Sequence, residues 1–105
     1  MINKLIRDKI PEIITANNQT AKIHIADDRE YELKLNEKLQ EETSEYLSSG
    51  NIEELADLME VVYAILESKN IEKNSFEHIR EEKAAKNGRF TKKLILESVI
   101  DTAKE

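Results

Sequence analysis

Apolar side chains recur at helical spacing over two long stretches of the chain. Over residues 29–48 they form a single stripe, within roughly 80° of the helix surface, made of Tyr31, Leu35, Leu39 and Tyr46. Over residues 52–69 they cover a wider arc of roughly 200°, which is typical of a helix that contacts more than one neighbour. Gly50 separates the two stretches, and Asn51 is placed to cap the second. The pattern predicts two helices joined by a tight turn.

Shorter patterns predict the elements on the N-terminal side. A helix should begin near Pro11 and end at Asn17 or Asn18. Residues 21–28 alternate apolar and polar positions, which is typical of a short strand. Asp27 and Glu30 then resemble a capping box ahead of the first long helix.

On the C-terminal side, the polar stretch after the second long helix predicts another connection. Asn74 or Ser75 should cap a third helix, which ends at Asn87 before Gly88. Residues 89–100 are ambiguous between strand and helix.

These elements predict an all-α fold, an antiparallel helical bundle with a minor short strand pair at most. At 105 residues the chain should form one domain over residues 1–105. Chains of this size bury only a modest core, so we expect a homodimer or a higher homo-oligomer. In that oligomer the broad apolar face of the second long helix should pack against the partner copy.

Composition limits the function classes. The net charge of −6 disfavours binding to nucleic acid, which needs clustered Lys and Arg. No apolar run approaches the roughly 20 residues that span a bilayer, so we expect no membrane partner. There is no cysteine and no signal-peptide core, which favours a cytoplasmic protein. His24 and His78 are isolated and are expected to be structural or exposed.

Acidic residues occupy positions that should be apolar. Glu42 falls in the middle of the stripe on the first long helix, and Glu45 lies at its margin. Glu54 lies inside the apolar arc of the second helix, and Asp57 lies just outside it. Since helices joined by a tight turn run antiparallel, these four carboxylates should approach one another.

Converging carboxylates would repel one another unless a cation neutralised them. Hard oxygen ligands are those that Mg²⁺, or Mn²⁺, prefers. Simpler interpretations stay open from the residues alone. Glu54 could complete a capping box with Asn51, and Glu41 and Glu45 could pair with Lys38 or remain solvated. The basic residues Arg80, Lys83, Lys86 and Arg89 could form a solvated face or complement a helix end.

The stretches "EETSE" and "EELAD" resemble the ExxE…ExxD signature of the MazG-like, all-α nucleoside triphosphate pyrophosphohydrolase superfamily. The resemblance extends over most of the chain and points to its phosphoribosyl-ATP pyrophosphohydrolase-like subgroup. It is carried, in order, by "NKLIRDKIPEII", "KLQEETSEYL", "EELADLMEVVYAI" and "EEKAAKNGRF". It implies an enzyme that hydrolyses an α,β-phosphoanhydride with Mg²⁺ and releases pyrophosphate from a nucleotide.

The resemblance also implies residue roles. The metal ligands would be Glu42, Glu45, Glu54 and Asp57. Phosphate contacts would come from Lys38, Arg7, Lys9 and Lys83. For the base that activates the attacking water, the candidates are Glu41 and Glu45.

Two other functions are weighed against hydrolysis of a nucleoside triphosphate. One is phosphoribosyl-ATP hydrolysis in histidine biosynthesis, which preferential turnover of that substrate would reveal. The other is a non-catalytic helical binding module that keeps the fold without turnover.

Overall fold

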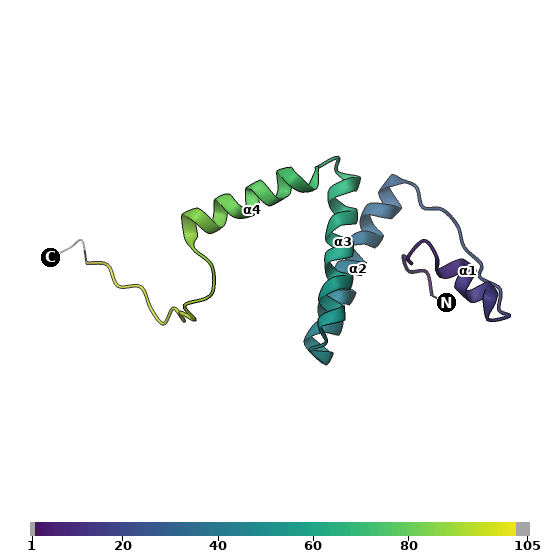
Figure 1. Cartoon of the computed structure of the whole chain (residues 1–105), viewed down its shortest axis with the longest axis horizontal. Coiled ribbons are helices and arrows are strands. Elements are labelled where there is room, and N and C mark those ends of the chain that lie inside the picture. The colour runs from purple at the N-terminus through teal and green to yellow at the C-terminus, as the bar shows by residue number, and fades with distance from the viewer. Residues whose placement is uncertain (1, 103–105) are drawn as a thin grey trace. The chain divides into compact units, whose positions relative to one another are not determined.

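The computed structural model describes residues 2–102, which divide into two units at the boundary between Lys73 and Asn74. The described residues form the helices α1 (Ile10–Ala16), α2 (Asp28–Ser49), α3 (Ile52–Ser68) and α4 (Lys73–Asn87) (Figure 1). They contain no strand, so the all-α class is confirmed and the minor strand pair is wrong. The single domain expected over residues 1–105 stays a prediction.

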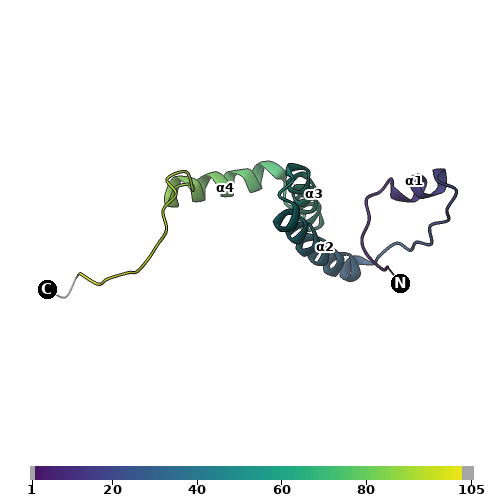
Figure 2. The ribbon, with the colours of Figure 1, turned by 90° about the horizontal axis from the view of Figure 1, so that it is seen from below.

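Helices α2 and α3 form an antiparallel pair that carries the core of the first unit. They lie side by side in each view (Figures 1 and 2). The buried apolar residues are Leu35 on α2 with Val61 and Leu66 on α3. Gly50 makes the tight turn possible because its φ of 70° lies in the left-handed region, and its N–H donates to the Tyr46 carbonyl at 2.8 Å. Both helices lie within one residue of their predicted bounds.

The predicted caps form only in part. The Asp27 side chain accepts a hydrogen bond from the Glu30 N–H at 2.9 Å. The Glu30 carboxylate, however, lies 3.0 Å from His24 Nε2. Its contact is therefore with the histidine and not with the Asp27 N–H, which a capping box would require. Asn51 is the N-cap of α3 as predicted, but its side chain makes no capping hydrogen bond.

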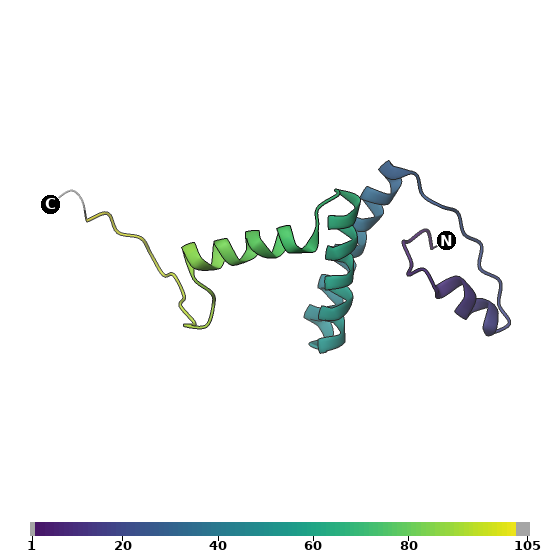
Figure 3. The same ribbon diagram turned by 45° about the horizontal axis from the view of Figure 1, so that its top comes forward.

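Three local predictions need correction or completion. Residues 21–27 are not a strand, because no second strand pairs with them in the part of the chain that is described, and Ile25 is 95% exposed. Helix α4 begins at Lys73, so neither Asn74 nor Ser75 is its cap. Residues 88–102 are neither helix nor strand, which settles the ambiguity of that segment (Figure 3).

The N-terminal helix follows its prediction closely. Helix α1 has Pro11 in its first turn and ends at Asn17, its C-cap. Asn18 follows with a φ of 59°, a left-handed conformation that Asn adopts more readily than most residues. None of the helices within residues 2–102 combines the length and the apolar character that crossing a bilayer requires.

Candidate metal centre

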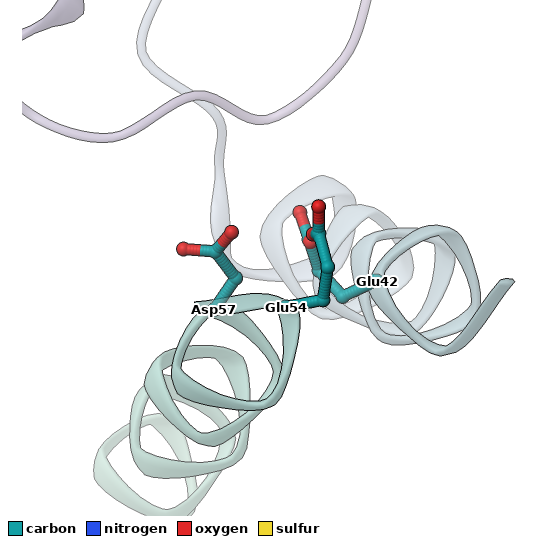
Figure 4. A group of neighbouring side chains, drawn as sticks. All are labelled: Glu42, Glu54 and Asp57. Carbon is teal, nitrogen blue, oxygen red and sulfur yellow. The ribbon is translucent and has the colours of Figure 1, made fainter. Parts of the chain in front are cut away.

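Three of the predicted carboxylates converge where α2 and α3 face each other near their turn. Glu42, Glu54 and Asp57 each offer one carboxylate oxygen, and these oxygens all lie within 4.8 Å of one another. Figure 4 shows the three side chains pointing to the same side of the helix pair, Glu42 from α2 and the other two from α3. We call these three residues the carboxylate cluster.

Helical spacing and one short turn explain how the three residues of the cluster come together. Glu54 and Asp57 are three residues apart, so they share one side of α3. Glu42 lies eight residues before Gly50 and Glu54 four residues after it, which places them near each other across an antiparallel turn. The predicted convergence is thus found for the three members of the carboxylate cluster.

The carboxylate cluster contains oxygens that the protein itself does not satisfy. Glu42 is only 6% exposed, and its Oε2 atom is buried with no hydrogen-bond partner among residues 2–102. The Oε2 atom of Glu54 is in the same state within the described chain. A buried carboxylate oxygen without a partner is unfavourable, because folding removes its water without replacing the lost hydrogen bonds. Both oxygens therefore indicate a ligand that would complete the site.

The pKa shifts of Glu42 and Glu54 also indicate that the site takes a cation. Burial raises the pKa of the Glu42 carboxyl above its ordinary value, and the negative charge of Glu45 raises it further, although Lys38 acts in the opposite direction. Burial also raises the pKa of Glu54, followed by the hydrogen bonding and charge of Glu45. Without a cation, both carboxyls are therefore driven towards the protonated form.

Basic side chains lie beside the carboxylate cluster. Lys38 Nζ is 3.6 Å from Glu42 Oε1, one turn away on α2. Arg7, from the segment before α1, donates to Asp57 Oδ1 at 2.7 Å. Lys4 from the same segment lies 3.4 Å from Glu41. The N-terminal segment is thus attached by ion pairs to the face of the helix pair that holds the cluster.

The two candidates for the base have different surroundings. Glu41 pairs with Lys38 at 3.2 Å and with Lys4, and although its burial opposes the effect, the two lysines lower its pKa. Glu45 is exposed and lies close enough to Glu54 to raise the pKa of that carboxyl. It is not one of the three residues of the carboxylate cluster, so its role as a fourth ligand stays a prediction.

A cavity of about 560 Å³ opens beside the carboxylate cluster, between the N-terminal segment and the helix pair. Its wall includes carboxylates, basic residues, two tyrosines and aliphatic side chains. The basic residues and tyrosines are Arg7, Lys9, Lys38, Lys73, Tyr31 and Tyr63. Three of the four predicted phosphate-binding residues therefore line one cavity together with Glu42 and Asp57.

The fourth predicted phosphate contact, Lys83, lies on α4 in the second unit, where it is exposed. It is not among the residues of the cavity wall. Conversely, sequence reasoning missed Lys73, whose Nζ lies 4.2 Å from the centre of the Tyr63 ring. No motif marks Lys73, because the turn after α3 brings it back to a residue ten positions earlier. His24 and His78 are exposed, as expected, and each lies beside a glutamate.

The carboxylate cluster fits a hard divalent cation. Three convergent carboxylates, two of which have a buried, unsatisfied oxygen, are ligands that Mg²⁺ and Mn²⁺ accept. A cation would offset both the burial and the repulsion that raise the pKa values of Glu42 and Glu54. Comparisons of this chain with family models, with curated proteins and with solved structures give no match. The chemistry of the site therefore has to be inferred from its residues.

Proposed function

We propose that this protein is a Mg²⁺-dependent pyrophosphohydrolase, which cleaves a nucleoside triphosphate or a related nucleotide to the monophosphate and pyrophosphate. The observation that carries the proposal is the pair of buried, unsatisfied oxygens of Glu42 and Glu54. They belong to a carboxylate cluster beside a cavity whose wall holds both acidic and basic side chains. The MazG-like resemblance of "EETSE" and "EELAD" supports the same reaction.

Carboxylates alone repel an anionic substrate, so the site needs a bridging cation. Glu42, Glu54 and Asp57 would hold Mg²⁺, or Mn²⁺ in its place, with Glu45 either as a further ligand or as the base that activates water. When bound, the ion would neutralise the charge between the carboxylates and the phosphates and would polarise a phosphoryl oxygen. Water would attack the α-phosphorus, and the bond to the β-phosphate oxygen would break to release pyrophosphate.

The cavity supplies the other requirements of a nucleotide site. Its volume falls in the range of about 300–1,000 Å³ that small-molecule sites usually have. Arg7, Lys9 and Lys38 would offset charge on the phosphates, in keeping with their predicted role. Lys83 stays a prediction because it belongs to the other unit.

Of the two base candidates, Glu45 fits better. Two lysines keep Glu41 in its carboxylate form and lower its pKa, which makes it a weaker acceptor of a proton from water. Glu45 is exposed and can therefore reach a substrate water without first losing an ion pair.

Two further proposals concern the compartment in which the protein works and its oligomeric state. An enzyme that acts on nucleotides and contains no cysteine fits the cytoplasm. We also propose that the working form is a homo-oligomer, since the described residues bury only three apolar side chains.

Pyrophosphate release from a panel of nucleoside triphosphates and phosphoribosyl-ATP, measured with Mg²⁺ and with EDTA, tests the proposal. We expect Mg²⁺-dependent release from at least one nucleoside triphosphate, because the site has the ligands and the phosphate-binding cations that this reaction needs. A preference for phosphoribosyl-ATP would redirect the substrate but keep the reaction. If Mg²⁺ binds but no substrate is hydrolysed, the protein is a binding module instead.

Replacing Arg7 should affect metal and substrate in opposite directions. In Arg7→Gln, Asp57 loses its cationic partner, so Mg²⁺ should bind up to about fivefold more tightly, the limit set by an exposed ion pair. The KM for the nucleotide should rise, because a phosphate contact is lost. Calorimetry with Mg²⁺ and steady-state kinetics measure the two effects. Lys69→Gln removes a cation that pairs with Glu32 away from the cavity and should change neither. Unchanged KM would exclude Arg7 from the substrate site.

A further inference from the structure

The segment from Phe90 to Ile100, which we call the arm, carries large apolar side chains that its own unit does not cover. Six of its large side chains are between 80% and 98% exposed: Phe90, Leu94, Ile95, Leu96, Val99 and Ile100. The arm forms neither a helix nor a strand (Figure 3). Proteins rarely leave a group of large apolar side chains of this kind facing water, so the arm marks an interaction surface.

The second unit cannot cover the arm by itself. Helix α4 has no buried residue, and none of the residues from 74 to 102 is buried. The polar side of α4 is instead occupied by ion pairs, such as those that link Arg80 to Glu77 and Arg89 to Glu81, each at 2.7–2.8 Å. The arm therefore needs a surface from outside its own unit.

Helix α3 carries an apolar surface that is also uncovered. Ile52 and Met59 are 73% and 38% exposed, and Leu55 and Val62 are half-buried. These four residues, which we call the outer face, recur at the spacing of one helix side. They lie roughly 140–160° around the helix from Asp57, so a segment bound there would approach α3 from the side opposite Asp57.

Charge favours the helix pair as the receptor of the arm. The stretch from Lys83 to Leu96 contains five basic residues and no acidic one. Helices α2 and α3 together contain twelve acidic residues and only three basic ones. Opposite charges of this kind steer association and fix its orientation.

We propose that the arm of one copy docks on the outer face of α3 in a second copy. Each copy carries one arm and one outer face, so two reciprocal contacts close a symmetric dimer. This interface is separate from the proposed reaction and does not depend on it.

The available area is sufficient for a stable dimer. A large aliphatic or aromatic side chain removes about 60–120 Å² of apolar surface from water when it is buried. Six such side chains on each of two arms, together with an equal area on the surfaces that receive them, would bury about 1,400–2,900 Å² in total, which reaches or exceeds the size of standard interfaces.

Sedimentation velocity of the full chain at about 1–100 µM tests the proposal, since a dimer dissociates on dilution. The wild type should dimerise. The arm variant Leu94→Asp with Leu96→Asp should weaken dimerisation by about 100-fold or more. Thr91→Asp with Ser98→Asp places the same charges at polar positions of the arm and should weaken it far less. Because Leu94 and Leu96 are at least 80% exposed, the arm variant should keep its helical circular dichroism.

Complementation identifies the receiving surface. The face variant Ile52→Asp with Met59→Asp should be monomeric alone, like the arm variant. A mixture of the two should form a heterodimer, because the arm of the face variant can still dock on the intact outer face of the arm variant. A wild type that is monomeric throughout the concentration range overturns the proposal, since no second copy then receives the arm. Face variants that dimerise as strongly as wild type, or a mixture that does not associate, also overturn it.

Discussion

Glu42→Gln should lower kcat for pyrophosphate release by about 100-fold or more, because even the loss of a group that only supports a metal ligand commonly costs about 10–100-fold. Glutamine keeps the shape of the side chain but removes the charge from the buried member of the carboxylate cluster. Asp57→Asn should have a similar effect from the other helix. Initial rates with saturating Mg²⁺ and nucleotide measure the loss.

Glu37→Gln is the matched control for this substitution. Glu37 lies on the same helix, but its side chain is 56% exposed and pairs with the neighbouring Lys34 at 3.3 Å. The activity of Glu37→Gln should stay within about twofold of wild type, as is usual for exposed positions away from a site. Wild-type rates in Glu42→Gln, with its fold intact by circular dichroism, would remove the carboxylate cluster from the reaction.

Glu42→Gln should stabilise the protein when no metal is present. Burial in the folded protein raises the pKa of Glu42 above its ordinary value of 4.5, so the folded state holds this proton more tightly than the unfolded state does. The Glu42 carboxyl therefore makes folding less favourable as the pH rises from about 4.5 through the raised pKa. In EDTA, Glu42→Gln should gain stability relative to wild type over this pH range, as measured by urea unfolding.

In Mg²⁺ the wild type should be more stable than Glu42→Gln, the reverse of the order in EDTA. A ligand at about 100 times its Kd stabilises the folded state by about 2.7 kcal/mol, and only the wild type keeps the full set of ligands. At neutral pH the wild type should therefore be the less stable protein in EDTA and the more stable one in Mg²⁺. Equal stabilisation of both proteins by Mg²⁺ would show that the ion binds elsewhere.

The helix pair and the three residues of the carboxylate cluster could be predicted from sequence. Long periodic stretches and a glycine between them define α2 and α3, and the position of Glu42 inside an apolar stripe marks it as unusual. Since the turn is short, antiparallel pairing then brings Glu42 towards Glu54 and Asp57 without further information. Local periodicity and one turn are enough for this part of the site.

Contacts between distant segments could not be predicted in the same way. Arg7 and Asp57 are 50 residues apart, and no local pattern indicates that the N-terminal segment returns to α3. The alternation at Ile23 and Ile25 predicts a strand, but a strand needs a partner, which the described residues do not supply. The start of α4 at Lys73 shows that capping residues place helix ends only to within a residue or two.

Hydrolysis of a nucleoside triphosphate in oxygen-18-labelled water tests the proposed reaction most directly. Attack of water on the α-phosphorus places the label in the nucleoside monophosphate and leaves the pyrophosphate unlabelled, which mass spectrometry of the two products detects. Label in the pyrophosphate, or release of orthophosphate in its place, would contradict a pyrophosphohydrolase that acts at the α-phosphorus.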